Sequence, residues 1–99
     1  MDIIKESVPD FYTAQGSADG TAKPLITESF FAGRNTYKGV RIKAHVGNTA
    51  VLLVGPATLT ADKAFRLLAG DDFCVPVSPT KIYVLAEGEG TCNYAWIAV

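Results

Sequence analysis

The sequence predicts an all-β domain: a small antiparallel β-sandwich or barrel of about seven strands with an extended N-terminal arm. Three observations lead to this prediction. Residues 38–46 alternate strictly between apolar and polar side chains, which is the period of a half-buried strand. Turn-forming residues separate about seven short strand candidates at intervals of about eight to twelve residues. No stretch carries the apolar stripe of an amphipathic helix.

Composition limits the classes of function. The chain has 99 residues, enough for one domain with a single core. Charged residues make up 19% of it, against roughly 25% in an average soluble domain. A short chain with so little charge often buries part of its surface against another subunit. The formal net charge of -1 provides neither a basic footprint for nucleic acid nor a polybasic membrane anchor.

The sequence shows neither a membrane-spanning segment nor a signal peptide. The longest apolar run, residues 49–59, contains Gly55 and Pro56 and is too short to span a membrane. Residues 1–6 lack the basic region and long apolar core of a signal peptide. We therefore expect a protein that is made in a cytoplasm and either stays there or leaves inside a larger particle.

Residues 1–24 are predicted to form an N-terminal arm and linker, and residues 25–99 the sandwich. The stretch 15–24 is small and polar, with two glycines and a closing proline, as in a flexible linker. Apolar residues that can dock on a neighbouring molecule precede it: Ile3, Ile4, Val8, Phe11 and Tyr12. A terminal strand added to the domain's own sheet fits the same residues equally well.

The middle of the chain contains the strand on which the prediction is centred. Residues 25–32 are a weaker strand candidate because their alternation slips at Glu28 and Ser29, and residues 33–38 form a turn. In residues 40–46 the apolar side chains face one way and Arg41, Lys43 and His45 the other. After a turn at 47–48, residues 50–54 are continuously apolar, which predicts burial on both faces.

The C-terminal half is predicted to contain four more strands. Residues 58–64 fit a single helical turn or an irregular crossing, and we predict a loop. Pro76 cannot donate to a ladder, so the strand that contains it is expected at a sheet edge. The predicted strands are residues 65–69, 73–77, 81–86 and 91–99, separated by turns at 70–72 and 78–79 and by a hairpin loop at 87–90.

The two cysteines, Cys74 and Cys92, fall in separate predicted strands. The fold could bring them together as a disulfide. Without a secretion signal, two reduced thiols that behave as small apolar side chains are favoured. With one histidine and no CxxC pair, no zinc site is predicted.

Acid–base chemistry has few candidates. His45 is the only histidine, and the alternation of its strand places it on the polar surface. The acidic pairs, Asp71 with Asp72 and Glu87 with Glu89, could bind calcium or cleave a glycoside, but glycine-containing turns place them in water. We predict no catalytic residues, no metal, no cofactor and no enzymatic activity.

Three aromatic residues, Tyr83, Tyr94 and Trp96, lie on neighbouring predicted strands. Such residues can stack sugar rings, as in carbohydrate-binding modules. Stacking of nucleic-acid bases would need a positive groove, which this composition lacks. A position in the core or at a subunit interface is the favoured interpretation.

Residues 38–99 resemble small β-rich structural proteins of tailed bacteriophages. The resemblance lies in the cadence of KGVRIKA at 38–44, NTAVLLVG at 48–55, FRLLAG at 65–70 and KIYVLA at 81–86, followed by a short aromatic–aliphatic final strand. It implies a virion component made in the host cytoplasm: a head decoration or cement protein, a head-fibre base, or a neck or tail module. Residues 1–37 do not share it, and it transfers no functional residue.

We therefore expect a capsid decoration protein that contacts the major capsid protein or another virion protein. The alternative is a carbohydrate-binding module of a host-recognition fibre. Neither face of the predicted strand 81–86, nor of residues 94–99 in the final strand, is polar, which predicts a dimer or trimer joined by apolar side chains that one core cannot accommodate. The candidate interface residues are Tyr83, Leu85, Tyr94, Trp96, Phe11 and Tyr12.

Overall fold

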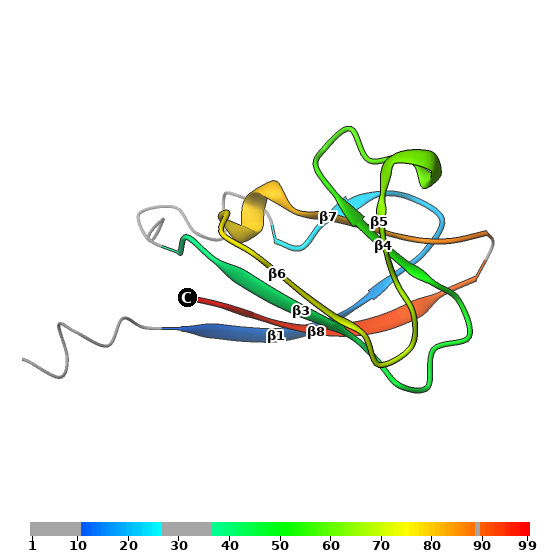
Figure 1. Ribbon diagram of the computed structural model, residues 1–99, viewed down its shortest axis with the longest axis horizontal. Helices are drawn as coiled ribbons and strands as arrows, with labels where there is room; N and C mark the ends of the chain where they lie inside the picture. Colours follow the sequence, from blue (N-terminus) through cyan, green and yellow to red (C-terminus); the bar gives the residue numbers. More distant parts are fainter. Residues whose placement is uncertain (1–10, 27–36, 89) are drawn as a thin grey trace, which may run out of the picture.

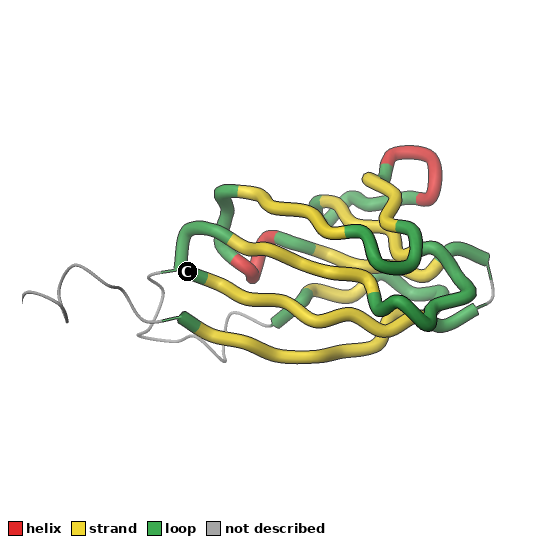
Figure 2. The backbone as a smooth tube through the Cα atoms, turned by 60° about the horizontal axis from the view of Figure 1, so that its bottom comes forward, coloured by secondary structure: helices red, strands yellow, loops and turns green. Residues whose placement is uncertain are grey.

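The computed structural model describes residues 11–26, 37–88 and 90–99, which form two four-stranded antiparallel sheets packed face to face (Figures 1 and 2). The predicted all-β sandwich is confirmed, and the described residues form eight strands rather than about seven. Sheet A has the order β1 (Tyr12–Ala18), β8 (Cys92–Ala98), β3 (Val40–Ala44), β6 (Asp72–Val75). Sheet B has the order β2 (Lys23–Pro24), β7 (Tyr83–Ala86), β4 (Leu52–Gly55), β5 (Phe65–Leu67). Among the described residues, two 3₁₀ turns, η2 (Ala61–Lys63) and η3 (Pro79–Lys81), lie in the connections.

The strands pair in a nested order. β1 pairs with β8, β2 with β7, β3 with β6 and β4 with β5, all antiparallel. The first four strands thus pair with the last four in reverse order, as in a long hairpin that is folded over into two sheets. The additional pairs β3 with β8 and β4 with β7 complete the two sheets. This connectivity is that of a jelly roll.

β3 lies in the interior of sheet A, between β8 and β6, and its alternation decides which face is buried. Val40, Ile42 and Ala44 are buried, whereas Arg41 and Lys43 are exposed, as the sequence predicts. The strand ends earlier than expected. Val46, predicted to face inward, lies in the following turn and is 71% exposed.

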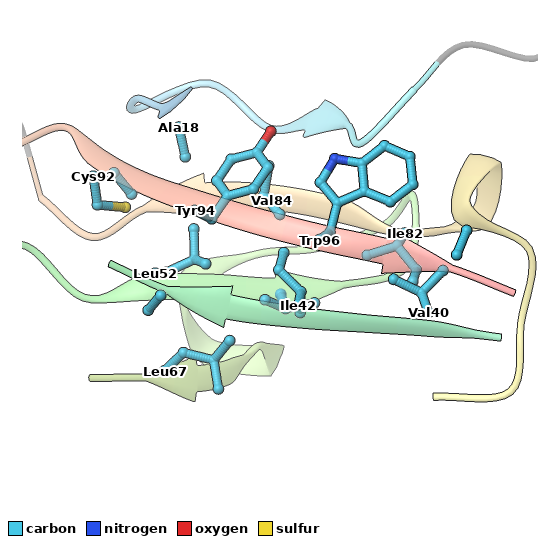
Figure 3. Packing of buried hydrophobic residues seen from close by; sticks show 14 of the residues in the cluster. Ala18, Val40, Ile42, Leu52, Leu67, Ile82, Val84, Cys92, Tyr94 and Trp96 are labelled. Atoms are coloured by element: carbon cyan, nitrogen blue, oxygen red, sulfur yellow. The ribbon is translucent and has the colours of Figure 1, made fainter. Parts of the chain in front are cut away.

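The core fills the space between the sheets. On β8, Tyr94, Trp96 and Ala98 are buried, and β7 contributes Val84 and Ala86 from the opposite sheet. Figure 3 shows Tyr94 and Trp96 projecting from the same side of β8 into this cluster. Burial of an aromatic side chain of this size contributes about 2–3 kcal/mol relative to leaving it exposed.

β4 is buried on both faces, as its continuous apolar run predicts: Leu52, Leu53 and Val54 are almost inaccessible. The connection between β4 and β5 covers part of the outer face, because Leu59 is buried and its side chain lies against Gly55. An ion pair between Arg66 on β5 and Glu87 after β7 joins the two strands that flank β4. It therefore crosses the outer face of β4.

The predicted division of the chain at residue 24 differs from the structure. Residues 12–18, assigned to the arm, form β1, which pairs with β8 along its whole length. For these residues the alternative of a terminal strand is the correct one. Seven consecutive residue pairs with the final strand make β1 an integral part of sheet A. The rest of the predicted arm, residues 1–10, lies outside the described residues.

Other boundaries shift by a few residues. Of the predicted strand 25–32, residues 25 and 26 are not in a strand and the remainder lies outside the described residues, as do 33–36 and Glu89. The predicted loop 58–64 contains the single turn η2. β6 ends one residue before Pro76 and lies at the edge of sheet A, which confirms the expected edge position.

Candidate functional site

Side chains from all four strands of sheet A meet on its outer face. Strand alternation and the pairing register place on it the residues that the core does not use. β8 contributes Asn93, Ala95 and Ile97, of which the first two are exposed and the third is half-buried. The flanking strands contribute Thr13, Gln15 and Ser17 from β1, Arg41 and Lys43 from β3, and Asp72 and Cys74 from β6.

A shallow groove runs along β8 on this face. Ala95 forms its floor because its neighbours across the sheet, Gln15 on β1 and Lys43 on β3, are longer. Two adjoining hollows of about 510 and 720 Å³ make up the groove. These volumes are in the range of small-molecule sites. The groove is open, however, so it would contact an extended ligand along one side only.

A polar network fixes one end of the groove. The Asn48 side chain bridges to the backbone of Asn93: its Nδ2 donates to the Asn93 carbonyl and its Oδ1 accepts from the Asn93 N–H, both at 2.9 Å. Ser17 Oγ donates to Asn93 Oδ1 at 2.7 Å. His45 is on the surface as predicted, and its Nδ1 accepts the Gly47 N–H at 3.0 Å. The Asn48 bonds tie the turn after β3 to β8, and the Ser17 bond ties β1 to the same residue of β8.

An ion pair joins β3 to the edge of the sheet. Arg41 Nε donates to Asp72 Oδ2 at 2.9 Å, and its Nη2 contacts the same oxygen. The hydrogen bond from Arg41, and then its charge, lowers the pKa of Asp72 below the ordinary value of 3.8. Both groups are exposed, so solvent screens the interaction. Asp72 is therefore a charged, paired surface carboxylate.

The opposite end of the same face is apolar. Ile97 and Val99 lie beside Cys74 and Pro76 there, around a hollow of about 310 Å³. Phe11 precedes β1 at this end, since the next residue, Tyr12, pairs with Ala98. Phe11 is 63% exposed and Val99 is 52% exposed. We refer to these five residues as the apolar patch: Phe11, Cys74, Pro76, Ile97 and Val99.

The predicted interface residues do not form one surface. Tyr94 and Trp96 lie in the core, because alternation on β8 sends them inward. Tyr12 is half-buried with its ring 5.3 Å from that of Trp96. Tyr83 and Leu85 are half-buried on the outer face of sheet B, and Phe11 is exposed at the end of sheet A. A sugar-stacking platform that includes Tyr94 and Trp96 on the surface is therefore not formed.

Both cysteines are free thiols, as the sequence favours: Cys74 is exposed on the outer face, and Cys92 is buried on the inner face of β8. Burial raises the pKa of the Cys92 thiol. Within residues 11–26, 37–88 and 90–99, no three metal-ligating side chains come together. In the same ranges, no helix is long and apolar enough to cross a membrane.

The acidic turn residues have structural partners. Asp71 Oδ2 accepts the Leu68 N–H at 3.0 Å, which closes the turn between β5 and β6. Its neighbour Asp72 pairs with Arg41, and Glu87 pairs with Arg66. Asp71 thus closes a turn, whereas Asp72 links strands within sheet A and Glu87 links strands within sheet B.

The order of the strands in the two sheets defines a class, the jelly-roll β-sandwich. No protein-family model and no curated protein sequence matches the chain. A chain from Bacillus endospore appendages, described as disulfide-linked pili, superposes with a TM-score of 0.50 at 18% identity, over 90% of this chain and 82% of that one. The mitogen derived from Yersinia pseudotuberculosis superposes with a TM-score of 0.47 at 15% identity, over 93% of this chain and 86% of that one. At 18% identity, the likeness to the appendage chain shows the fold alone.

Proposed function

We propose that this protein is a structural component of the virion of a tailed bacteriophage, where it decorates the capsid as a cement protein. It is non-enzymatic in this proposal, and its contribution is mechanical. Contacts made by many copies with the major capsid protein, or with another virion protein, sum to resist internal pressure. The sequence support is the resemblance of residues 38–99 to small β-rich phage proteins. Jelly rolls occur in viral capsids, but also in lectins and cupins, so the fold is only an analogy.

The observation that carries the proposal is the apolar patch. It gathers residues from the start of β1, the end of β8 and the end of β6 on one face, and two of them are more than half exposed. Exposed apolar surface costs about 25 cal/mol per Å² relative to burial. A patch of this kind, next to a charged pair such as Arg41 and Asp72, is typical of a protein–protein contact.

The test uses particles with and without the protein. Purified protein should rebind to particles that lack it and raise their thermal stability, and an Ile97→Lys variant should rebind at least tenfold more weakly. The isolated Ile97→Lys protein should keep its fold, because Ile97 lies on the outer face. Thr60→Lys is a matched control, because Thr60 is exposed and its side chain makes no capping bond. Particles that neither contain nor rebind the protein would overturn the proposal.

A second candidate is a carbohydrate-binding module of a host-recognition fibre, and the groove along β8 is the observation that favours it. Its rim carries hydrogen-bonding side chains, Gln15, Lys43 and Asn93. It lacks the predicted stacking residues, because Tyr94 and Trp96 are in the core. A glycan array separates the two candidates. Specific binding that is lost in Lys43→Ala and retained in Val99→Lys, a change in the apolar patch outside the groove, would favour the module over the cement protein.

A further inference from the structure

The four edges of the two sheets differ in how they are protected against pairing with another chain. β6 carries Asp72 in its ion pair and is followed directly by Pro76. β5 has three residues with the charged Arg66 in its centre, and β2 has only two residues, a lysine and a proline. Short strands, charges and prolines are the usual devices that prevent association between edges.

β1 has none of these devices. It is seven residues long, with the sequence YTAQGSA, which contains no charge and no proline. Figure 2 shows it as the strand at the bottom of the sheet, with no described strand beyond it. An edge of this length and composition is a template for a further strand.

The hydrogen bonds of β8 determine which backbone groups of β1 are free. The Val99 N–H and carbonyl both bond to Gly39, and the Asn93 carbonyl accepts the His45 N–H. Because these groups alternate along an antiparallel ladder, the odd-numbered residues of β8 bond toward β3 and the even-numbered ones toward β1. The register pairs Tyr94 with Gly16 and Trp96 with Ala14.

It follows that the even-numbered residues of β1 use their backbone groups inside the sheet. The N–H and carbonyl groups of Thr13, Gln15 and Ser17 point outward along the edge. These three positions are symmetric about Gln15, and their side chains are uncharged and exposed.

We propose that this edge pairs antiparallel with β1 of a second copy, with a twofold axis at Gln15. Gln15 then faces Gln15 of the partner subunit, and Thr13 faces Ser17 of the partner subunit. All three outward donors and acceptors of each strand are used, and no like charges are opposed. The two copies of sheet A form one continuous eight-stranded sheet. This inference deepens the proposed assembly role by naming the partner, but the pairing can be tested without any particle.

The test uses a charge swap at the twofold axis. Sedimentation of the native protein from micromolar to millimolar concentration should show a monomer–dimer equilibrium. Gln15→Lys and Gln15→Glu should each weaken association about tenfold or more, because each variant opposes two like charges. An equimolar mixture of the two variants should restore a heterodimer, because Lys then faces Glu. Thr58→Lys, an exposed change in the β4–β5 connection, is the matched control and should leave association unchanged.

A backbone variant provides an independent readout. Gln15→Pro removes an outward N–H while leaving the bonds from β1 to β8 in place, so it should abolish dimerisation and keep the fold. A protein that stays monomeric to millimolar concentration overturns the pairing. A dimer that survives unchanged in folded Gln15→Lys and Gln15→Pro also overturns it and indicates another surface. If the dimer forms but the protein does not bind particles, the proposed virion role fails and the pairing stands.

Discussion

Gly16 lies directly against the ring of Tyr94. The two residues are paired across β1 and β8, and a Cβ built on Gly16 would lie 2.6 Å from Tyr94 Oη and 2.7 Å from its Cζ. Tyr94 is 7% exposed and belongs to the core cluster. The glycine at this point of β1 is therefore a packing requirement imposed by the tyrosine, and not a sign of a flexible linker.

We expect Gly16→Ala to destabilise the protein by about 1–3 kcal/mol, the range for forcing an extra carbon into a packed site. Elsewhere in a strand, the same substitution usually stabilises by reducing the entropy of the unfolded chain. Chemical denaturation of the two proteins measures the difference. A second variant, Tyr94→Leu, should make the alanine less costly, and additive effects in the double variant would contradict the proposed contact.

Truncation of two neighbouring residues on β8 should destabilise the protein to very different extents. Trp96→Ala is expected to cost about 3–5 kcal/mol, because the indole is fully packed in the core. Ile97→Ala should cost much less, since Ile97 is only half-buried on the outer face. Thermal midpoints and denaturant titrations of both variants provide the comparison. Equal losses would mean that the outer face of sheet A is also packed.

Alternation made the central strand predictable, but it could not say which apolar face of a strand with two apolar faces is buried. For β3 the charged Arg41 and Lys43 decided the question from sequence alone. On β8, Tyr94 and Trp96 alternate with Ala95 and Ile97, so only the position of sheet B shows that the aromatics face inward. For the same reason, the sequence could not show that the predicted interface residues lie in three places: the core, the outer face of sheet B and the end of sheet A.

The jelly-roll connectivity also could not be predicted from the pattern of apolar and polar residues. Pairing of β1 with β8 joins positions 12 and 98, and no local signal specifies a contact of that separation. In addition, the small residues of β1 suggest a linker when their partner is unknown. The groove along β8 and the apolar patch arise from this long-range pairing, so the sequence alone could not predict them.

The ion pairs at the sheet edges should make stability depend on pH in the acid range. The pKa of Asp72 is lowered by Arg41, and that of Asp19 is lowered by the Thr21 N–H and then by Lys23. A lowered pKa in the folded state means that the unfolded chain binds protons first as the pH falls. The resulting stabilisation is therefore present above the ordinary value of 3.8 and is lost as the pH falls through the lower folded values.

Thermal midpoints between neutral pH and pH 2 test this sign. The native protein should lose stability in acid more steeply than Asp72→Asn, and Asp72→Asn with Asp19→Asn should be the least sensitive. High salt should reduce the difference between native and variant proteins, because both carboxylates are exposed. A variant that loses stability in acid as steeply as the native protein would show that these pairs do not contribute.

The two thiols should differ in reactivity. Cys74 is exposed on β6, whereas Cys92 is buried and its pKa is raised, so at neutral pH little thiolate is present at Cys92. Titration with a chromogenic disulfide should show one fast thiol in the native protein and two in denaturant. Cys74→Ser should remove the fast phase. Rapid reaction of both thiols in the native protein would mean that the core around β8 opens readily.

Deletion of β1 should damage the fold. The strand contributes seven of the residue pairs of sheet A and covers one side of β8. Removing it leaves the even-numbered backbone groups of β8 without partners and opens the core beside Tyr94 and Trp96. A chain that begins at Asp19 should therefore unfold, or at least lose most of its cooperativity, when compared with one that begins at Phe11.

Circular dichroism and hydrogen exchange of the two chains measure this difference. Comparing the two chains isolates the contribution of β1 from that of residues 1–10. Equal midpoints would show that β1 is a detachable arm after all, and the dimer through its edge would then have no rigid template.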